Sequence, residues 1–344
     1  MVIKDGRWHT LDSDGIGTSG ARIGPWIENC VFESIADDCF VLGAGYLYVK
    51  EKAGERKLTM YDLDPYKIRK EDHIVFYNPR LGIPIIAAIV VEVDYENQTV
   101  TFDRELPDMQ SGNGKPNDFG INKNTGNQYF VIKDNIVKDS RRNAVRMRNG
   151  LSYGIFENNL FEGNEDPPMA LWSDVNWNLP QEIRDQVARA YSEAELPAFS
   201  HELTDVEYLI IQGNTFRECG FNNANGNVFL TMNRTGNQPA RWQAINNIYL
   251  LDNLFENWSG DQAIRIQCAR NVFIQENTFA NRGNRYQSGQ PGSVISLFNC
   301  SDIYVYDNQV RDDRDPEEFI LSEEVSGLHQ GRNGEESEHR NIQE

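Results

Sequence analysis

The sequence lacks several features by which whole classes of protein are recognised. No run of apolar residues is long enough to span a bilayer, and Met1 is followed by Val-Ile-Lys-Asp with no basic and then apolar leader. Basic residues are few, since 33 Lys and Arg stand against 52 Asp and Glu and give a net charge of −19. A body this acidic, with no basic stripe, repels nucleic acid and anionic lipid. We therefore expect no nucleic-acid partner and no membrane span.

Cysteine is also scarce, and the cysteines are not paired along the chain. The five are Cys30, Cys39, Cys219, Cys268 and Cys300. Their odd number and the lack of a CxxC spacing argue against a zinc site and against a disulfide framework. We expect them to be small interior residues, and we predict neither a metal ion nor a cofactor.

One short phrase recurs along the chain: an apolar residue, two further residues, Asn, any residue, and then Phe or another apolar residue. Its Asn stands at seven positions, the first of them displaced by one place: Asn29, Asn135, Asn159, Asn214, Asn253, Asn277 and Asn308. Asn135 and Asn159 are 24 residues apart, and so are Asn253 and Asn277. A period in the twenties is typical of one coil of a parallel solenoid.

The residue types at each place of the phrase suit such a coil. The β-branched and aromatic residues alternate along short strands and point into the bore. Asn tolerates left-handed backbone at a corner and can hydrogen-bond its neighbours there. Each coil buries its apolar side only against its neighbours, so a hydrophobic content of 39% suffices. We predict an all-β fold, a right-handed parallel β-helix of the pectate-lyase-like kind; a propeller would need periods of about 40–45 residues.

Two stretches interrupt the repeat and a third follows it. Residues 44–118 contain four β-patterned runs and predict an inserted small antiparallel sandwich or barrel. Residues 180–191 have helical spacing, with Pro in the first turn. Residues 317–344 are acidic, polar and unpatterned, and we expect a poorly ordered tail there. The predicted β-helix domain is therefore discontinuous, with residues 1–43 and 119–316.

Aspartates gather in the first two coils. Asp14 and Asp37 are 23 residues apart, close to the 24-residue period, so we expect them to stack on one wall about 5 Å apart. Together with Asp38 they form a patch whose mutual repulsion should raise at least one pKa. A glycosidase needs one protonated acid and one ionised carboxylate of this kind. Because consecutive strand residues face opposite sides, we expect the chain to turn or bulge at Asp37 and Asp38.

A family resemblance is carried by Thr10–Gly15, Glu28–Asp38, the inserted β domain, and Val131–Asn135 followed by Ser140–Ala144. The chain resembles glycoside hydrolase family 110 through most of residues 8–312. The resemblance implies a bacterial, exo-acting, inverting α-1,3-galactosidase that acts on terminal galactosides and is secreted, periplasmic or on the cell surface. It also implies that Asp14, Asp37 and Asp38 are the catalytic residues.

Two departures leave alternatives open. The segments around Asp14-Gly15-Ile16 and Asp37-Asp38-Cys39 are also similar to polygalacturonases, although the Gly-His-Gly motif of that family is absent. Only 13 residues precede Asp14, so the first coil would expose strand edges and core. We expect the chain to be a fragment of a longer gene.

Arginines in the following coil are candidate sugar-binding groups. Arg142, Arg146 and Arg148 alternate along the chain, and one set should face outward beside the aspartates. Guanidinium groups offer several fixed donors to hydroxyls or carboxylates. Ion pairs that merely hold the acidic wall together are an equally open interpretation.

Trp172, Asp174 and Trp177 occupy the matching place one coil later. Two tryptophans that flank an aspartate at an insertion point favour sugar binding, although tryptophan is more often a core residue. Arg265 is a weaker candidate, for which a purely structural role is open.

Three functions are compatible with these residues. The first is an inverting exo-glycosidase that uses Asp14, Asp37 and Asp38 without a metal. The second is another enzyme on the same scaffold, either polygalacturonase-like or a polysaccharide lyase whose aspartates hold Ca²⁺ while an arginine acts as the base. The third is a carbohydrate-binding β-helix without catalysis. The oligomeric state and the linkage cleaved do not follow from the sequence.

Overall fold

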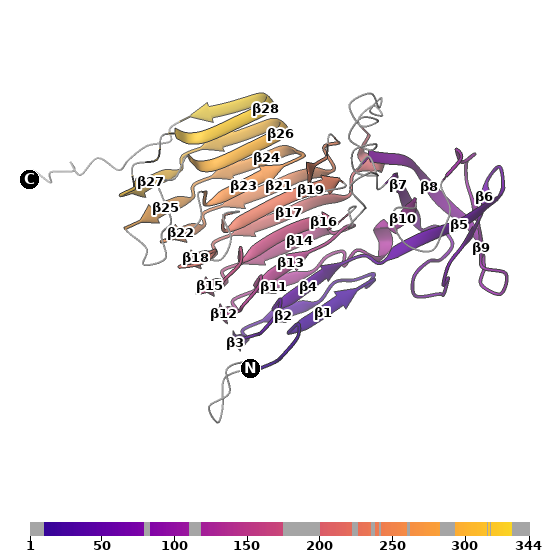
Figure 1. The fold of residues 1–344 in the computed structure, drawn as a ribbon, viewed down its shortest axis with the longest axis horizontal. Coiled ribbons are helices and arrows are strands. Elements are labelled where there is room, and N and C mark those ends of the chain that lie inside the picture. The colour runs from indigo at the N-terminus through magenta and orange to yellow at the C-terminus, as the bar shows by residue number, and fades with distance from the viewer. Residues whose placement is uncertain are drawn as a thin grey trace, which may run out of the picture.

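The chain folds into a parallel β-helix that carries a small β-barrel on one side, as a computed structural model shows (Figure 1). The structure describes residues 10–78, 83–109, 118–174, 200–221, 226–234, 238–240, 242–259, 262–282, 293–314, 316 and 318–331. The predicted fold class is confirmed, since successive coils pair in parallel and the inserted strands form a closed antiparallel barrel.

Each coil contributes strands to three faces. Face 1 contains β1 (Ile16–Ser19), β4 (Phe40–Gly43), β13 (Val145–Met147), β16 (Met169–Asp174), β19 (Val228–Arg234), β23 (Ile264–Gln267) and the first half of β26 (Ser293–Tyr306). Face 2 contains β2 (Trp26–Glu28), β11 (Val131–Lys133), β14 (Ser152–Glu157), β17 (Val206–Gln212), β21 (Ile245–Leu251), β24 (Ala269–Gln275) and the second half of β26. Face 3 contains β3 (Val31–Glu33), β12 (Ile136–Lys138), β15 (Leu160–Glu162), β18 (Thr215–Arg217), β22 (Leu254–Glu256), β25 (Thr278–Asn281) and β27 (Gln309–Asp312).

The 24-residue period is the register between coils that no insertion separates. Ile136 pairs with Leu160, and Leu254 pairs with Thr278. Inward side chains occupy equivalent positions in successive coils and stack on one another. The ring centroids of neighbouring members are 4.9–5.3 Å apart in the column Phe161, Phe216, Phe255 and Phe279. These rings are fully buried and belong to one continuous core that runs along the solenoid.

The Asn of the repeat forms a buried ladder, but not for the whole reason expected. From Asn159 onward its Oδ1 accepts hydrogen bonds from the backbone N and the Nδ2 of the Asn one coil earlier, as Asn214 does for Asn159 at 3.0 and 2.9 Å. The left-handed backbone belongs instead to the preceding residue, as at Asn158 (φ 54°) and Asp252 (φ 51°). The expected stacking is confirmed from Asn135 onward. The expected left-handed conformation is found at Asn29 (φ 55°) but is wrong for the repeat Asn of the later coils.

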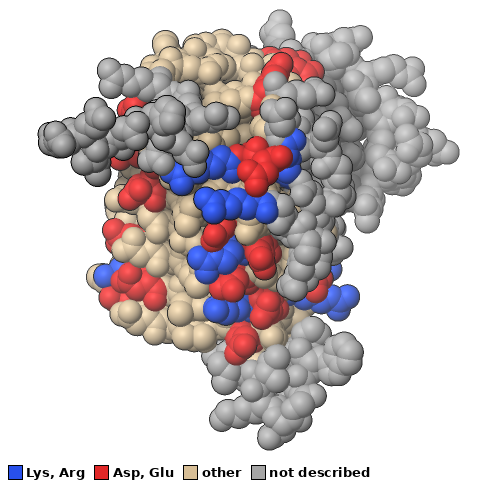
Figure 2. All heavy atoms as spheres, turned by 90° about the vertical axis from the view of Figure 1, so that its left-hand side faces the viewer, with Lys and Arg blue, Asp and Glu red and all other residues tan. Residues whose placement is uncertain are grey.

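Charged side chains alternate on the outer surface of face 3. Lys138 lies 3.1 Å from Glu162, and Arg217 bridges Glu162 at 3.9 Å and Glu256 at 2.5 Å. Figure 2, which shows this side of the molecule, has acidic and basic groups interspersed rather than segregated. Such exposed pairs add little stability each, about 0–1 kcal/mol, so the buried core and Asn ladder dominate the fold.

The barrel is inserted between β4 and β11. Its strands close in the order β10-β5-β6-β9-β8-β7, with the bounds β5 (Tyr46–Gly54), β6 (Lys57–Met60), β7 (His73–Asn78), β8 (Ile83–Asp94), β9 (Thr99–Phe102) and β10 (Phe119–Asn122). The predicted insertion, 44–118, is therefore too short at its end, because β10 pairs with both β5 and β7. Arg22 of the first coil donates two 2.7 Å hydrogen bonds to the buried Asp72 and ties the barrel to the solenoid.

The expected tail is wrong over part of its length. Residues Glu318–Gly331 form β28, which pairs in parallel with β26 and continues faces 1 and 2 for another coil. The acidic residues suggested disorder, but they lie exposed on this outermost strand, while Ile320 and Val325 pack on the core. The expected helix at 180–191 and the tail beyond 331 lie outside the described residues.

Short elements complete the described chain: η1 (Lys123–Thr125), η2 (His201–Leu203) and β20 (Gln238–Pro239). In the part of the chain that the structure describes, no helix has the length and apolar character needed to cross a membrane.

Candidate active site

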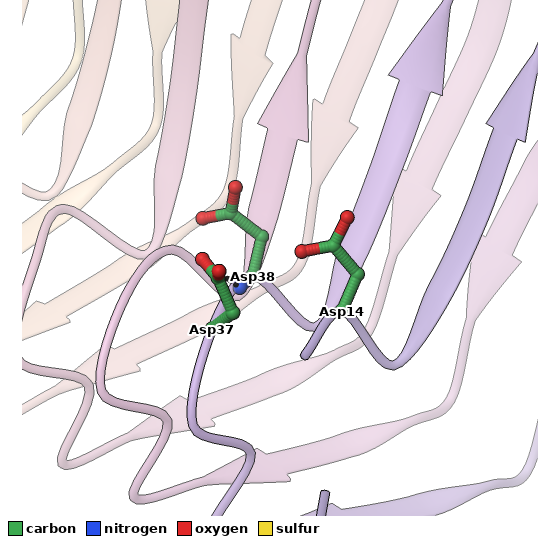
Figure 3. Close-up of side chains that lie close together, drawn as sticks. All are labelled: Asp14, Asp37 and Asp38. Atoms are coloured by element: carbon green, nitrogen blue, oxygen red, sulfur yellow. Dashed lines mark hydrogen bonds between the residues drawn. The ribbon is translucent and has the colours of Figure 1, made fainter. Parts of the chain in front are cut away.

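Three aspartate side chains converge where the first two coils enter face 1 (Figure 3). Asp14 precedes β1, and Asp37 and Asp38 lie in the bend between β3 and β4. One oxygen from each carboxylate lies within 4.8 Å of one from each of the others. The chain does bend at the aspartate pair, so both side chains reach the same patch.

The backbone register shows which aspartates stack. Ile16 pairs with Phe40, and the Gly15 N–H donates to the carbonyl of Asp38 at 2.9 Å. Asp14 therefore lies one coil below Asp38, at the full 24-residue period, and Asp37 lies to one side. The expected stacking of Asp14 with Asp37 is one residue out of register.

Gly15 has a structural reason to follow Asp14. A Cβ at this position would lie 2.6 Å from the backbone oxygen of Cys39, which is far inside van der Waals contact. The Asp-Gly pair therefore lets the first coil approach the second closely where the carboxylates meet.

Asp38 is the buried member of the cluster, with 2% of its surface exposed. Its Oδ1 accepts a hydrogen bond from the Asn143 N–H at 3.1 Å, and Arg146 Nη1 donates to its Oδ2 at 3.4 Å. Burial raises the pKa of Asp38, and the negative charges of Asp37 and Asp14 raise it further. The Arg146 charge and the Asn143 hydrogen bond oppose that rise without cancelling it. The surroundings of Asp38 thus favour its protonated form.

Two predicted arginines lie beside the aspartates. Arg146, on β13, faces Asp38, and Arg142 Nε lies 3.6 Å from Asp37 Oδ1 with both side chains about half exposed. Arg148 directly follows β13 and lies against Gly43, where an added Cβ would lie 2.5 Å from the Cβ of Arg148. The outward set that approaches the carboxylates is therefore Arg142 and Arg146.

A fourth carboxylate, Asp166, was missed by the sequence reasoning. Since Val145 pairs with Met169, Arg142 and Asp166 occupy equivalent positions in successive coils. Burial raises the pKa of Asp166, while the charges of Arg142 and Arg146 oppose this. The 24-residue offset from Arg142 was the signal that could have found it.

The predicted residues of the next coil lie elsewhere along face 1 or outside the described residues. Ala170 is the partner of Arg146, so Trp172 and Asp174 follow two and four residues further along β16. Trp177 lies outside the described residues. A sugar-binding role for these three stays a prediction.

A cavity of about 250 Å³ lies at the opposite end of β1 from Asp14. Its lining comes from the first coil, the barrel and η1: Ser19, Gly20, Gly45, Tyr46, Leu47, Asp64, Tyr66, Lys67 and Thr125. None of the three aspartates lines this cavity. The aspartate cluster is instead open to solvent through Asp37, whose side chain is 42% exposed.

Fold and site together define a parallel β-helix with a convergent aspartate cluster at the edge of one face. No protein-family model and no curated protein matches the chain. Solved structures that resemble it include the surface adhesin PfbA of Streptococcus pneumoniae (14% identity, 62% of this chain and 52% of that one, TM-score 0.34) and the tailspike protein gp49 from Pseudomonas phage LKA1 (10% identity, 94% and 54%, TM-score 0.37).

A third such structure is the Gp54 tailspike of Acinetobacter baumannii bacteriophage AP22, solved in complex with A. baumannii capsular saccharide (11% identity, 94% of this chain and 64% of that one, TM-score 0.22). The chain spans about half the length of the adhesin and of the LKA1 tailspike. At these identities the likeness concerns the fold alone.

Proposed function

We propose that the protein is a carbohydrate-active enzyme, a glycoside hydrolase that uses Asp14, Asp37 and Asp38. The observation that carries the proposal is the convergence of three carboxylates of which one, Asp38, is buried with a raised pKa. Glycoside hydrolysis needs a protonated carboxyl to deliver a proton to the leaving oxygen and an ionised carboxylate on water or on the sugar. Asp38 suits the first role, and the more open Asp14 and Asp37 suit the second.

The finer assignment is an inverting, exo-acting α-1,3-galactosidase of an extracellular or cell-surface protein, as the family resemblance implies. One feature bears on the stereochemistry. The closest carboxylate oxygens lie within 4.8 Å, whereas inverting enzymes usually separate their two carboxyl groups by about 6.5–9.5 Å. The anomeric configuration of the first-formed product is therefore the sharpest test of this part.

The purified chain should be incubated with nitrophenyl glycosides and with α-1,3-linked galactosyl oligosaccharides, and the products followed by NMR. We expect release of galactose whose anomeric configuration is opposite to that of the bond cleaved. Retained configuration would overturn the inverting assignment, and release of another sugar would overturn the galactose assignment. An absence of turnover on every glycoside tried would count against hydrolysis itself.

A polysaccharide lyase is the second candidate, because the three carboxylates could also hold a divalent cation. Arg146 would then be a candidate base beside the cation. This function predicts that a chelator abolishes activity, that Ca²⁺ restores it, and that the product is unsaturated and absorbs in the ultraviolet. The hydrolase predicts full activity in the chelator and a saturated product, so one assay with and without chelator separates the two.

The pH profile tests the role of Asp38. A general acid must be protonated, so activity should fall as the pH rises through the raised pKa of Asp38. Because the Arg146 charge lowers that pKa, Arg146→Gln should move the alkaline limb of the kcat/KM profile to higher pH. Arg217→Gln, which removes a charge from face 3, is the matched control and should leave the limb in place. An unmoved limb in Arg146→Gln would assign the proton donor to another group.

A further inference from the structure

Three tyrosines stack on the outside of the solenoid, at the start of the face 2 strands. They occupy equivalent positions in successive coils, since Val131 pairs with Ile155 and Gly154 with Leu209. The three are Tyr129, Tyr153 and Tyr208. Their ring centroids are 5.2 and 5.0 Å apart, with interplanar angles of 17° and 7°. All three side chains are exposed, Tyr129 at 61%. We call this set the tyrosine ladder.

The backbone at the ladder is in the left-handed region. The φ angles of Tyr129, Tyr153 and Tyr208 are 60°, 56° and 55°. A bulky side chain is rare in this conformation, because its Cβ crowds the following carbonyl. In the next three coils the same column has Asn247, Asn271 and Asp302, also with positive φ, and these residue types tolerate it well. The fold therefore needs a left-handed residue here but does not need tyrosine.

Stacking alone does not explain the choice. A second column on face 2 stacks Tyr249, Phe273 and Tyr304 at 5.0 and 4.7 Å, and none of these residues has a positive φ. Those rings are also less exposed than the ladder. Outward rings can thus stack between coils with ordinary strand backbone. The fold requires the left-handed backbone but not a bulky side chain on it, and strained residues of this kind concentrate in proteins at sites that bind or react.

Tyr129, at the first-coil end of the ladder, is the most exposed of the three tyrosines. The residue below Tyr129 in the first coil is Gly24, whose N–H donates to the carbonyl of Gln128 at 2.7 Å. A Cβ at Gly24 would collide with Phe130 and the Asn127 carbonyl, so this position admits no side chain below the ladder. On either side of Gly24 in the chain, Ile23 and Trp26 are exposed at 76% and 69%.

We infer that the tyrosine ladder is a binding site for a neutral saccharide chain. Tyrosine joins a flat apolar ring to a hydroxyl, which matches a sugar that offers one apolar face and a rim of hydroxyls. A net charge of −19 disfavours an anionic polymer and a second copy of this chain. The ladder follows the C-terminal ends of the face 1 strands, whereas the aspartates precede their N-terminal ends. It is therefore separate from the candidate active site and would hold a polymer at a distance from it.

The test replaces all three tyrosines by the residue that later coils use, in the variant Tyr129→Asn/Tyr153→Asn/Tyr208→Asn. The probes are galactomannan and β-glucan set in native gels, with polygalacturonate as the anionic comparison. We expect the parent protein to be retarded by a neutral polysaccharide, and the triple variant to bind it roughly tenfold more weakly or worse. The melting temperature should stay unchanged or rise, because Asn accepts the left-handed backbone.

The matched control is Tyr249→Asn, which removes an outward ring from the other column and should leave retardation unchanged. Unaltered retardation of the triple variant, or a parent that neither neutral polymer retards, would overturn the inference. A lower melting temperature with unaltered retardation would make the ladder a packing device. A parent that is dimeric by light scattering and becomes monomeric on substitution would make it a protein interface, which also overturns it.

The inference stands apart from the proposed hydrolysis. In the binding measurements the reference protein, the triple variant and the Tyr249→Asn control all carry Asp38→Asn in addition, so that turnover cannot remove the polymer. The ladder variant in the parent background should cleave a small nitrophenyl glycoside at the parental rate. Loss of binding with such cleavage intact supports the ladder, whereas binding without any cleavage counts only against the hydrolase.

Discussion

Asp38→Asn is expected to lower kcat by about 10³-fold and to leave the fold intact. Loss of a general acid typically costs about 10²–10⁴-fold, and 10³-fold corresponds to about 4 kcal/mol of activation free energy. The amide is nearly isosteric with the carboxyl, and its oxygen can still accept from the Asn143 N–H. Removing the negative charge also relieves repulsion from Asp37 and Asp14. The measurements are kcat on the glycoside found active and the thermal unfolding curve.

Asp12→Asn is the matched control for this variant. Asp12 lies two residues before Asp14, is exposed, and is not among the three converging carboxylates. Its substitution should leave kcat within about twofold, as surface changes usually do. A folded Asp38→Asn protein with parental kcat would remove Asp38 from the catalytic group. A substrate with an activated leaving group should reduce the loss of kcat in Asp38→Asn, since such a leaving group needs less protonation to depart.

Stability gives a second consequence of the same burial. A carboxyl group whose pKa is raised on folding stabilises the native state most below its unfolded pKa, and this contribution is lost as the pH rises through the folded value. Asp38 is such a group. The Asp38→Asn protein should therefore lose less stability than the parent as the pH is raised from acid towards neutral.

The repeat was visible in the sequence because the solenoid imposes the same demand on every coil. The Asn of each phrase has to satisfy buried backbone groups, so its identity recurs from Asn135 to Asn308. The sequence did not indicate which residue has the left-handed backbone, because Asp134, Asn158 and Glu276 share a positive φ but not a residue type. β28 was missed for a similar reason, since the outermost strand exposes most of its side chains and has a polar sequence.

The candidate site was visible only where coils follow one another without interruption. Asp14 and Asp38 are separated by one uninterrupted coil, so the period placed them to within one residue. The contacts of Asp38 with Asn143 and Arg146 cross the barrel insertion, and register across an insertion depends on folded pairing, here Phe40 with Val145. The tyrosine ladder has no sequence motif, because its members are separated by different intervals and their left-handed backbone appears only in three dimensions.

Asn214→Ala is expected to lower the free energy of unfolding by about 4 kcal/mol. Its fully buried side chain accepts from Asn159, donates to the Phe156 carbonyl at 2.9 Å and donates to Asn253 Oδ1 at 3.1 Å. Alanine would leave these partners buried and unsatisfied, at about 1–3 kcal/mol each. Chemical denaturation should show the loss as a lower midpoint.

The loss should also be local, because each coil of a solenoid contacts only its neighbours. Hydrogen exchange should therefore accelerate first in β15, β18 and β22, which flank the ladder at Asn159, Asn214 and Asn253. Asn158→Ala is the matched control, since this exposed neighbour of Asn159 lies outside the buried ladder and risks only its left-handed backbone, at about 1 kcal/mol. Equal losses in the two variants would show that the buried amides contribute no more than an exposed corner. A far larger loss of stability in Asn214→Ala, with exchange that spreads outward from the middle coils, would identify the Asn ladder as the main polar determinant of the fold. The physical reason is that the aromatic stacks alone leave the corner carbonyls without hydrogen-bond donors.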